Sequence, residues 1–181
     1  TGKIGIAFIN ICKGFGMNVV AYDPFPRTDI DVKYVTIDEL VKMSDIISLH
    51  CPLTNDTKHI INEDTINNMK NGAIIVNTSR GALVDSQALL KGLKDKKILG
   101  ACLDVYKEEA NLFFEDNSNE IIQDDVLALL ISLPNVIITS HQGYLTKEAL
   151  ENIAETTLNN ITAYFNNEYL ENEICYRCKK N

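Results

Sequence analysis

The sequence has little positive charge and no long apolar segment, and both shortages narrow its function. Its 181 residues hold 17 lysines and arginines against 25 aspartates and glutamates, a net charge of −8. Such a charge repels phosphate backbones and anionic membranes, which argues against nucleic-acid binding as the primary role. No apolar run approaches the roughly 20 residues that cross a bilayer, and the first residues lack the features of a signal peptide. We therefore expect a cytoplasmic protein.

Cysteines are few and odd in number, which argues against a disulfide framework. The five are Cys12, Cys51, Cys102, Cys175 and Cys178. A scattered, odd set is typical of reduced thiols. Cys175 and Cys178 could supply half of a zinc site, but a structural zinc site needs four ligands and the sequence has no second pair. We predict that no metal is bound.

Short apolar runs rich in β-branched residues alternate with helical patterns along the chain. The runs cover residues 18–22, 45–49, 73–77, 98–103 and 135–139. Helices are expected at about residues 36–43, 63–69, 85–94 and 124–130. This alternation predicts a parallel sheet. Because the runs are almost continuously apolar, we expect helices on both faces of that sheet.

A last helical pattern, at about residues 146–165, carries an apolar stripe on one face. The stripe consists of Leu150, Ile153, Ala154, Leu158, Ile161 and Phe165. Such a stripe must pack on another apolar surface. The polar residues 166–181 are expected to form a loosely ordered tail.

The opening residues, Thr1-Gly2-Lys3-Ile4-Gly5, fit the end of the glycine-rich motif G-x-G-x-x-G. In that motif the second glycine lets the backbone approach a pyrophosphate, and the third allows close packing of helix and strand. Gly2 and Gly5 would take these places. The first glycine and the strand before it are absent, so we expect a doubly wound, Rossmann-like sheet without its first strand. That strand is central in the order 3-2-1-4-5-6, so runs 18–22 and 45–49 should lie on one side of a gap and the other three runs on the far side.

A carboxylate follows the first of these runs. Asp23, next to Tyr22, comes 18 residues after Gly5, where dinucleotide-binding folds place a carboxylate on the adenosine ribose 2′-hydroxyl. A carboxylate there would repel the 2′-phosphate of NADP, so the pattern favours NAD. Arg27, four residues on, leaves binding of NADP as an alternative. The Asp23-Pro24 turn signal leaves a purely structural role of Asp23 as another.

Arginine and histidine are both scarce, so candidates for chemistry are few. The sequence contains only Arg27, Arg80, Arg177, His50, His59 and His141. In open parallel sheets, ligands bind beyond the carboxyl ends of the strands. Arg80, His141 and His50 directly follow expected strands, and we expect all three to face that crevice.

Three motifs occur in an order that resembles the D-2-hydroxyacid dehydrogenases. They are Val76-Asn77-Thr78-Ser79-Arg80-Gly81-Ala82-Leu83-Val84-Asp85, then Leu103-Asp104-Val105-Tyr106, then His141 closing the next strand. Segments 111–116 and 122–125 and the pair His141-Gln142 resemble the fermentative D-lactate dehydrogenase branch. The resemblance implies an NAD-binding domain in residues 1–144, and a C-terminal helix and tail, 145–181, that pack toward a substrate domain outside this chain.

The resemblance also implies an activity: hydride transfer between NAD(H) and a small 2-hydroxy or 2-keto acid, with D-lactate and pyruvate favoured. Arg80 would bind the substrate carboxylate through a two-pronged hydrogen bond. His141 would exchange a proton with the ketone oxygen. Glu109, five residues after Asp104, would orient His141 and favour its protonated form. Glu108 leaves this last assignment open by one residue.

Further residues are implied to line the cofactor and substrate. Gly2, Lys3, Ile4 and Gly5 would hold the pyrophosphate, and Tyr22 and Asp23 the ribose. By resemblance, His50, Cys51 and Pro52 would lie along the adenosine half, and Thr78, Ser79 and Asp104 at the cofactor, with Thr78 and Asp104 near the nicotinamide. Tyr144 would face the substrate, although Gly143-Tyr144 departs from the Ala-Phe expected in the family. His50 could equally be a strand-end histidine without a ligand.

Three alternatives stay open. The substrate could be hydroxypyruvate or a longer 2-keto acid, the same residues could serve an NAD-sensing corepressor, or the chain could be an inactive fragment. Turnover separates the enzyme from the sensor. We expect the complete protein to be a homo-oligomer, and residues 1–181 alone to be inactive.

Overall fold

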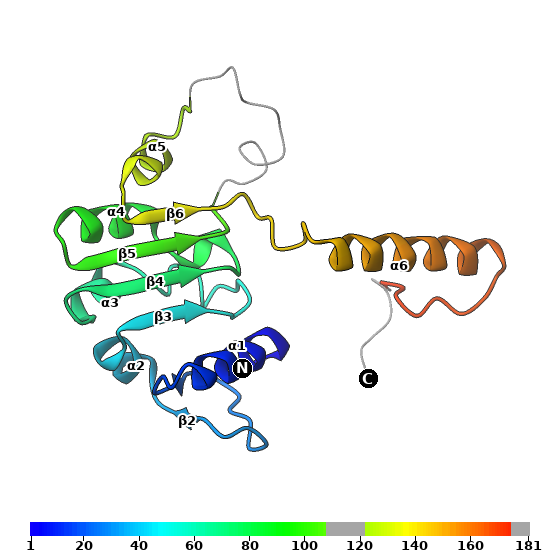
Figure 1. Cartoon of the computed structure of the whole chain (residues 1–181), viewed down its shortest axis with the longest axis horizontal. Coiled ribbons are helices and arrows are strands. Elements are labelled where there is room, and N and C mark those ends of the chain that lie inside the picture. Colours follow the sequence, from blue (N-terminus) through cyan, green and yellow to red (C-terminus); the bar gives the residue numbers. More distant parts are fainter. Residues whose placement is uncertain (108–121, 175–181) are drawn as a thin grey trace. The chain divides into compact units, whose positions relative to one another are not determined.

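The structure is a computed structural model, and it describes residues 1–107 and 122–174. The chain divides into two compact units, Thr1–His141 and Gln142–Asn181. Each unit is described by itself below, with elements labelled as in Figure 1.

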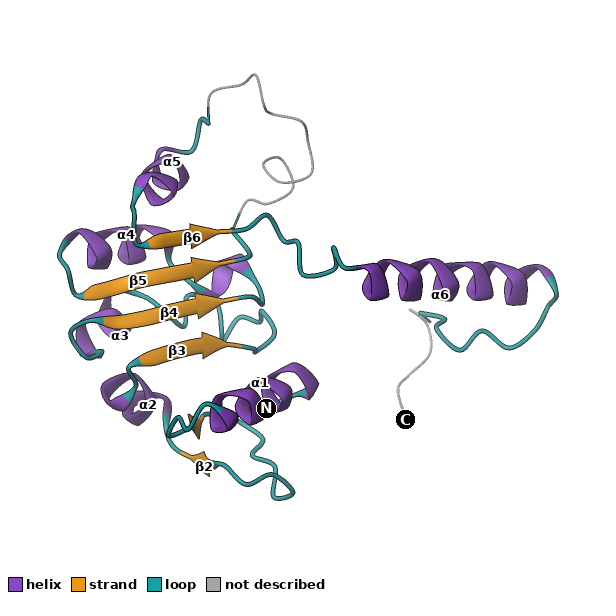
Figure 2. Cartoon of the chain, viewed as in Figure 1, coloured by secondary structure: helices purple, strands orange, loops and turns teal. Residues whose placement is uncertain are grey.

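The first unit is built on a four-stranded parallel sheet, which Figure 2 shows in orange. Its strands are β3 (Ile46–Leu49), β4 (Ala73–Asn77), β5 (Ile98–Leu103) and β6 (Val136–Ile138), in the order β3-β4-β5-β6. The predicted parallel sheet is thus confirmed. Leu49 pairs with Asn77, Asn77 with Leu103, and Leu103 with Ile138, so the carboxyl ends of all four strands lie at one edge.

Four helices cover one face of this sheet. They are α2 (Ile37–Met43), α3 (Glu63–Asn68), α4 (Ser86–Lys94) and α5 (Asp125–Ser132). Each packs beside the next, as right-handed crossovers between parallel strands require. Each begins at a side chain that accepts a backbone N–H, namely Thr36, Asn62, Asp85 and Asp124. The core between helices and sheet includes the fully buried Ile61, Ile75, Leu83, Leu89, Ile98 and Leu130.

The opposite face of the four-stranded sheet is less covered by the described residues than the face that α2 to α5 cover. Leu99 and Ile137 point away from the helices and are 60% and 62% exposed. The strands therefore alternate between buried and more exposed positions. The helices α3, α4 and α5 lie on one face because the crossovers from β3 to β4, β5 and β6 all run in the same direction along the sheet.

A second, two-stranded sheet lies in the same unit. It pairs β1 (Val20–Ala21) with β2 (Lys33–Tyr34) in parallel, and α1 (Lys3–Gly14) leads into β1. The strands thus form two sheets, as the expected gap requires. The expectation that run 45–49 lies with run 18–22 was wrong, since β3 pairs with β4. The partner of β1 is the unpredicted β2, whose two residues are too short for an apolar periodicity.

The second unit contains α6 (Lys147–Phe165). Its predicted apolar stripe is present, and within the described residues of this unit its large side chains are exposed: Leu150, Ile153, Leu158, Ile161 and Phe165. The following segment turns back along the helix, and Asn172 Nδ2 donates to Asn160 Oδ1 over 3.0 Å. No helix in the described residues is long and apolar enough to span a membrane.

Candidate functional site

The loop after β4 carries Arg80 and is organised by a buried amide. Asn77, the last residue of β4, is 1% exposed. Its Nδ2 donates to the Arg80 carbonyl over 2.9 Å, and its Oδ1 accepts the Ser79 N–H over 3.1 Å. The Arg80 side chain is exposed, and its Nη1 donates to the Ser79 carbonyl over 2.7 Å. The Asn77 side chain thus fixes the backbone of the loop, while the Arg80 guanidinium stays accessible to solvent.

A close backbone contact joins this loop to the loop after β5. A Cβ on Gly81 would lie 2.0 Å from the Tyr106 carbonyl carbon and 2.4 Å from the Lys107 nitrogen, so only glycine fits. Tyr106 is itself buried, and its hydroxyl donates to the Asp124 carboxylate over 2.9 Å. Arg80 is therefore held next to the chain that leads toward Glu109.

Hydrogen bonds also connect the residues that follow β4, β5 and β6. The Asp104 N–H donates to the Asn77 carbonyl over 2.9 Å, and the His141 N–H donates to the Asp104 carbonyl over 2.7 Å. The Thr139 hydroxyl donates to the Asp104 carboxylate. His141 adopts a left-handed backbone, with φ 51°. Arg80, Asp104 and His141 thus follow three adjacent strands at one edge of the sheet.

The start of α1 fits an anionic group. Gly2 is its N-cap and provides no side-chain hydrogen bond, whereas each of the other described α-helices has a side-chain cap. The first N–H groups of α1, those of Lys3, Ile4 and Gly5, point along the helix axis and suit a pyrophosphate. Gly5 is buried, and a Cβ there would contact the His50 Cβ at 3.6 Å.

His50 and Cys51 follow β3 at the same edge. His50 Nε2 lies 2.9 Å from Ser48 Oγ, and its ring lies 5.1 Å from the ring of Phe8. Burial lowers the pKa of His50, which favours the neutral ring. Burial also raises the pKa of the Cys51 thiol, and the Cys51 carbonyl accepts the Ser79 hydroxyl over 2.7 Å. The loop after β3 is thus attached to the Arg80 loop; Pro52, which follows, is exposed.

Asp23 lies two residues beyond β1. Its Oδ2 accepts the Thr1 hydroxyl over 2.8 Å. Its Oδ1 accepts the Phe25 N–H over 2.9 Å. Asp23 therefore has the turn-forming role considered from the sequence, and its position beside the glycine segment is compatible with ribose binding as well. Tyr22 is exposed beside it.

Several predicted residues lie outside the described residues or outside the first unit. Glu108, Glu109 and segment 111–116 lie outside the described residues, as do Cys175 and Cys178. Tyr144 belongs to the second unit, and its role toward the substrate stays a prediction.

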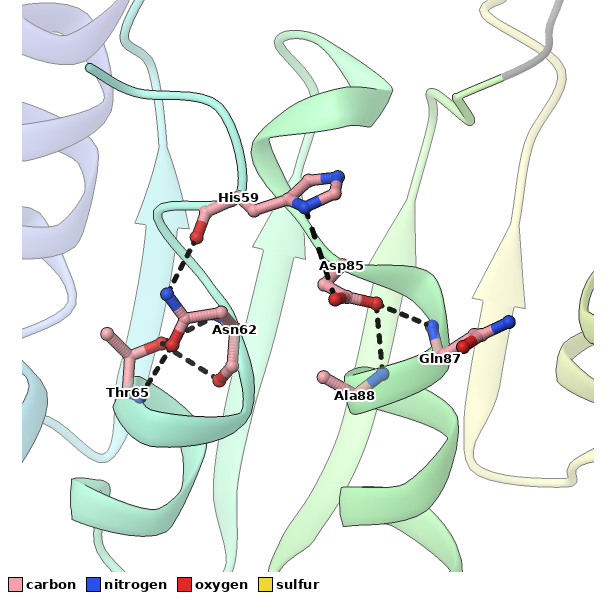
Figure 3. A network of polar contacts seen from close by, with 6 residues as sticks. All are labelled: His59, Asn62, Thr65, Asp85, Gln87 and Ala88. Atoms are coloured by element: carbon pink, nitrogen blue, oxygen red, sulfur yellow. Dashed lines mark hydrogen bonds and ion pairs between the residues drawn. The ribbon is translucent and has the colours of Figure 1, made fainter. Parts of the chain in front are cut away.

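Sequence reasoning missed a polar network that holds the segment after Arg80 (Figure 3). His59 Nδ1 lies 4.0 Å from Asp85 Oδ2, and the other Asp85 oxygen accepts the N–H groups of Gln87 and Ala88. Asn62 Nδ2 donates to the His59 carbonyl over 3.0 Å. The His59 N–H donates to the Ala82 carbonyl over 2.9 Å. The contacts of His59 with Asp85 and Ala82 join residues that are distant in the sequence and have no local signal, whereas the helix-capping role of Asp85 has one.

The first unit and its edge of loops define a dinucleotide-binding domain. The model for the NAD-binding domain of the D-isomer specific 2-hydroxyacid dehydrogenases matches residues 1–143. The chain therefore belongs to this family, which confirms the predictions of family and cofactor.

Named relatives agree with this assignment. The D-lactate dehydrogenase of Escherichia coli (strain K12) is 50% identical over 177 residues, which are 96% of this chain and 54% of that protein. A D-lactate dehydrogenase structure from Treponema pallidum has a TM-score of 0.91 and 43% identity, covering 97% of this chain and 54% of that one. The structure of D-lactate dehydrogenase from Aquifex aeolicus, solved with NAD and lactic acid, has a TM-score of 0.84 and 38% identity. The match covers 93% of this chain and 52% of that one. The chain thus spans about half the length of these relatives.

Proposed function

We propose that the complete protein is an NAD-dependent D-2-hydroxyacid dehydrogenase whose preferred pair is pyruvate and D-lactate. The observation that carries this proposal is the edge where Arg80, Asp104 and His141 follow adjacent strands and are joined through hydrogen bonds. Family membership supports the reaction type, and the D-lactate dehydrogenases among the relatives support the substrate. Assembly as a homo-oligomer and a cytoplasmic location remain predictions.

The side chains at this edge match what the reduction of a 2-keto acid requires. Arg80 offers a planar, permanently charged fork, which binds a carboxylate through two parallel hydrogen bonds. His141 donates a proton to the ketone oxygen as the carbonyl carbon is reduced, and takes one back in the reverse direction. The hydride itself is supplied by NADH when it is bound. Asn77 and Gly81 hold the Arg80 loop in place, so the substrate is oriented before reaction.

The cofactor is proposed to lie across the same edge. The N–H groups of Lys3, Ile4 and Gly5, with Gly2 before them, would bind the pyrophosphate. Tyr22 and Asp23 would contact the ribose. The remaining cofactor contacts are proposed at His50, Cys51, Pro52, Thr78, Ser79 and Asp104.

This function is tested by turnover of the complete protein with a panel of keto acids. We expect NADH-dependent reduction of pyruvate with a higher kcat/KM than that of hydroxypyruvate or phenylpyruvate. Preference for a different keto acid would leave the reaction type intact and correct the substrate. Tight NADH binding without reduction of any keto acid would contradict the proposal and favour an NAD-sensing module.

The proposed role of Glu109 leads to a pH prediction. A carboxylate beside His141 favours the protonated ring that keto-acid reduction needs. In Glu109→Gln, kcat/KM for reduction should therefore fall off at a lower pH than in the parent. Glu108→Gln is the matched control and should keep the parental pH profile. A parental profile in Glu109→Gln together with a shifted one in Glu108→Gln would assign the role to Glu108.

A further inference from the structure

We propose that Asp29 is a second determinant of selectivity for NAD over NADP, because it holds the guanidinium of Arg27 away from the place where a 2′-phosphate would bind. The proposal rests on NAD binding by this domain and on Asp23 marking the ribose. It does not depend on which keto acid is reduced.

Arg27 is the residue that could make this domain accept NADP. It is the only arginine that precedes Arg80 in the sequence, and arginine is the side chain best suited to bind a phosphate. In dinucleotide-binding folds an arginine near the ribose accommodates the 2′-phosphate. From the sequence alone, Arg27 therefore favours binding of NADP, whereas Asp23 favours binding of NAD.

A chain of hydrogen bonds brings Arg27 close to Asp23. The Arg27 N–H donates to the Tyr34 hydroxyl over 3.1 Å, and this hydroxyl lies 2.9 Å from the Thr1 hydroxyl. The Thr1 hydroxyl in turn donates to Asp23 Oδ2 over 2.8 Å. The Arg27 backbone is thus at most three hydrogen-bond lengths, roughly 9 Å, from the Asp23 carboxylate. A long arginine side chain can span such a distance.

The Arg27 side chain is instead held by Asp29. Arg27 Nε donates to Asp29 Oδ1 over 2.9 Å, and Nη2 donates to Asp29 Oδ2. Both carboxylate oxygens of Asp29 thus accept hydrogen bonds from the guanidinium. A phosphate would bind the guanidinium through the same two-pronged geometry. Hydrogen bonding to Asp29 raises the pKa of Arg27, and the same contact lowers the pKa of Asp29.

The expected effect is moderate, because the pair is open to water. The side chains of Arg27 and Asp29 are 48% and 63% exposed, and exposed ion pairs contribute little. Selectivity would then come from both repulsion by Asp23 and loss of an available arginine.

The experiment measures dissociation constants of NADPH, NADH and 2′,5′-ADP for the full-length protein by fluorescence titration. Asp29→Asn should tighten NADPH and 2′,5′-ADP by about two- to fivefold, the range of an exposed ion pair, and leave NADH unchanged. Asp23→Asn/Asp29→Asn should gain more than the product of the single gains, because the released Arg27 binds the 2′-phosphate more strongly once repulsion by Asp23 is removed.

Two controls separate this mechanism from a general change of charge. Asp31→Asn removes the same charge two residues away, where the carboxylate pairs with Lys13 over 3.0 Å, and should leave all three constants unchanged. Arg27→Gln/Asp29→Asn should lose the gain. An equal gain in Asp31→Asn, a gain that persists without Arg27, or no gain in Asp29→Asn would each overturn the proposal. Because binding is measured, absence of keto-acid turnover would contradict the proposed function and leave this inference standing.

Discussion

Replacing Arg80 with lysine is expected to lower kcat/KM for the 2-keto acid by roughly 10- to 150-fold, which corresponds to about 1.5–3 kcal/mol for a hydrogen bond to a charged group. Lysine keeps the positive charge, but it offers a point charge in place of the planar fork. The loop backbone should not move, since Asn77 contacts only the main chain of Ser79 and Arg80. The loss therefore measures the carboxylate contact itself.

Two further measurements show whether Arg80 acts on the substrate. The dissociation constant of NADH and the free energy of unfolding should both match the parent, because the guanidinium is exposed and donates to the carbonyl of its own neighbour Ser79. Unchanged keto-acid turnover in Arg80→Lys would show that another group binds the carboxylate. A fall in stability of the same size as the fall in activity would make Arg80 a structural residue.

Replacing Gly81 with alanine is expected to have the second large effect, on both stability and activity. The new Cβ would lie 2.0 Å from a backbone carbon of Tyr106, and a backbone cannot move aside as a flexible side chain can. Forcing atoms into a packed site typically costs about 1–3 kcal/mol, and here the loops after β4 and β5 must also separate. The free energy of unfolding in urea and kcat/KM should fall together.

Gly14→Ala is the matched control for Gly81→Ala. Gly14 is the last residue of α1, and a Cβ there would meet nothing within 4 Å. Alanine in a helix stabilises by about 0.5–1 kcal/mol relative to glycine, so this variant should be as stable as the parent or slightly more so. A Gly81→Ala protein with parental stability would show that the two loops are not pressed together as described.

The edge that carries the candidate site was predictable from the sequence because parallel strands share their direction. Arg80 and His141 each follow a short β-branched run, so both had to fall at the carboxyl edge once the sheet was taken as parallel. The helix starts at Thr36, Asp85 and Asp124 were predictable within one residue for a similar local reason, since these side chains cap their own helices.

What the sequence did not predict depends on contacts between distant residues. The strand β2 has only two residues, Lys33 and Tyr34, and it exists because β1 lies beside it. Because β2 was not predicted, run 45–49 was expected next to run 18–22 and thus in the wrong half of the sheet. Two further contacts, between Gly81 and Tyr106 and between His59 and Asp85, likewise follow from the packing of separate loops. No local sequence pattern predicts them.

The buried amide of Asn77 has a consequence for how the specificity of such a domain can change. It supports the Arg80 loop through main-chain atoms alone, and it lies beneath the loop rather than in the crevice. Thr78 and Arg80 can therefore exchange side chains while the course of the backbone is kept, whereas the Ser79 hydroxyl also attaches the loop to the Cys51 carbonyl. Substitutions that change specificity are thus expected at positions 78 and 80. Asn77 itself allows no exchange, because even aspartate would lose the Nδ2 donor and set a carboxylate against the Arg80 carbonyl.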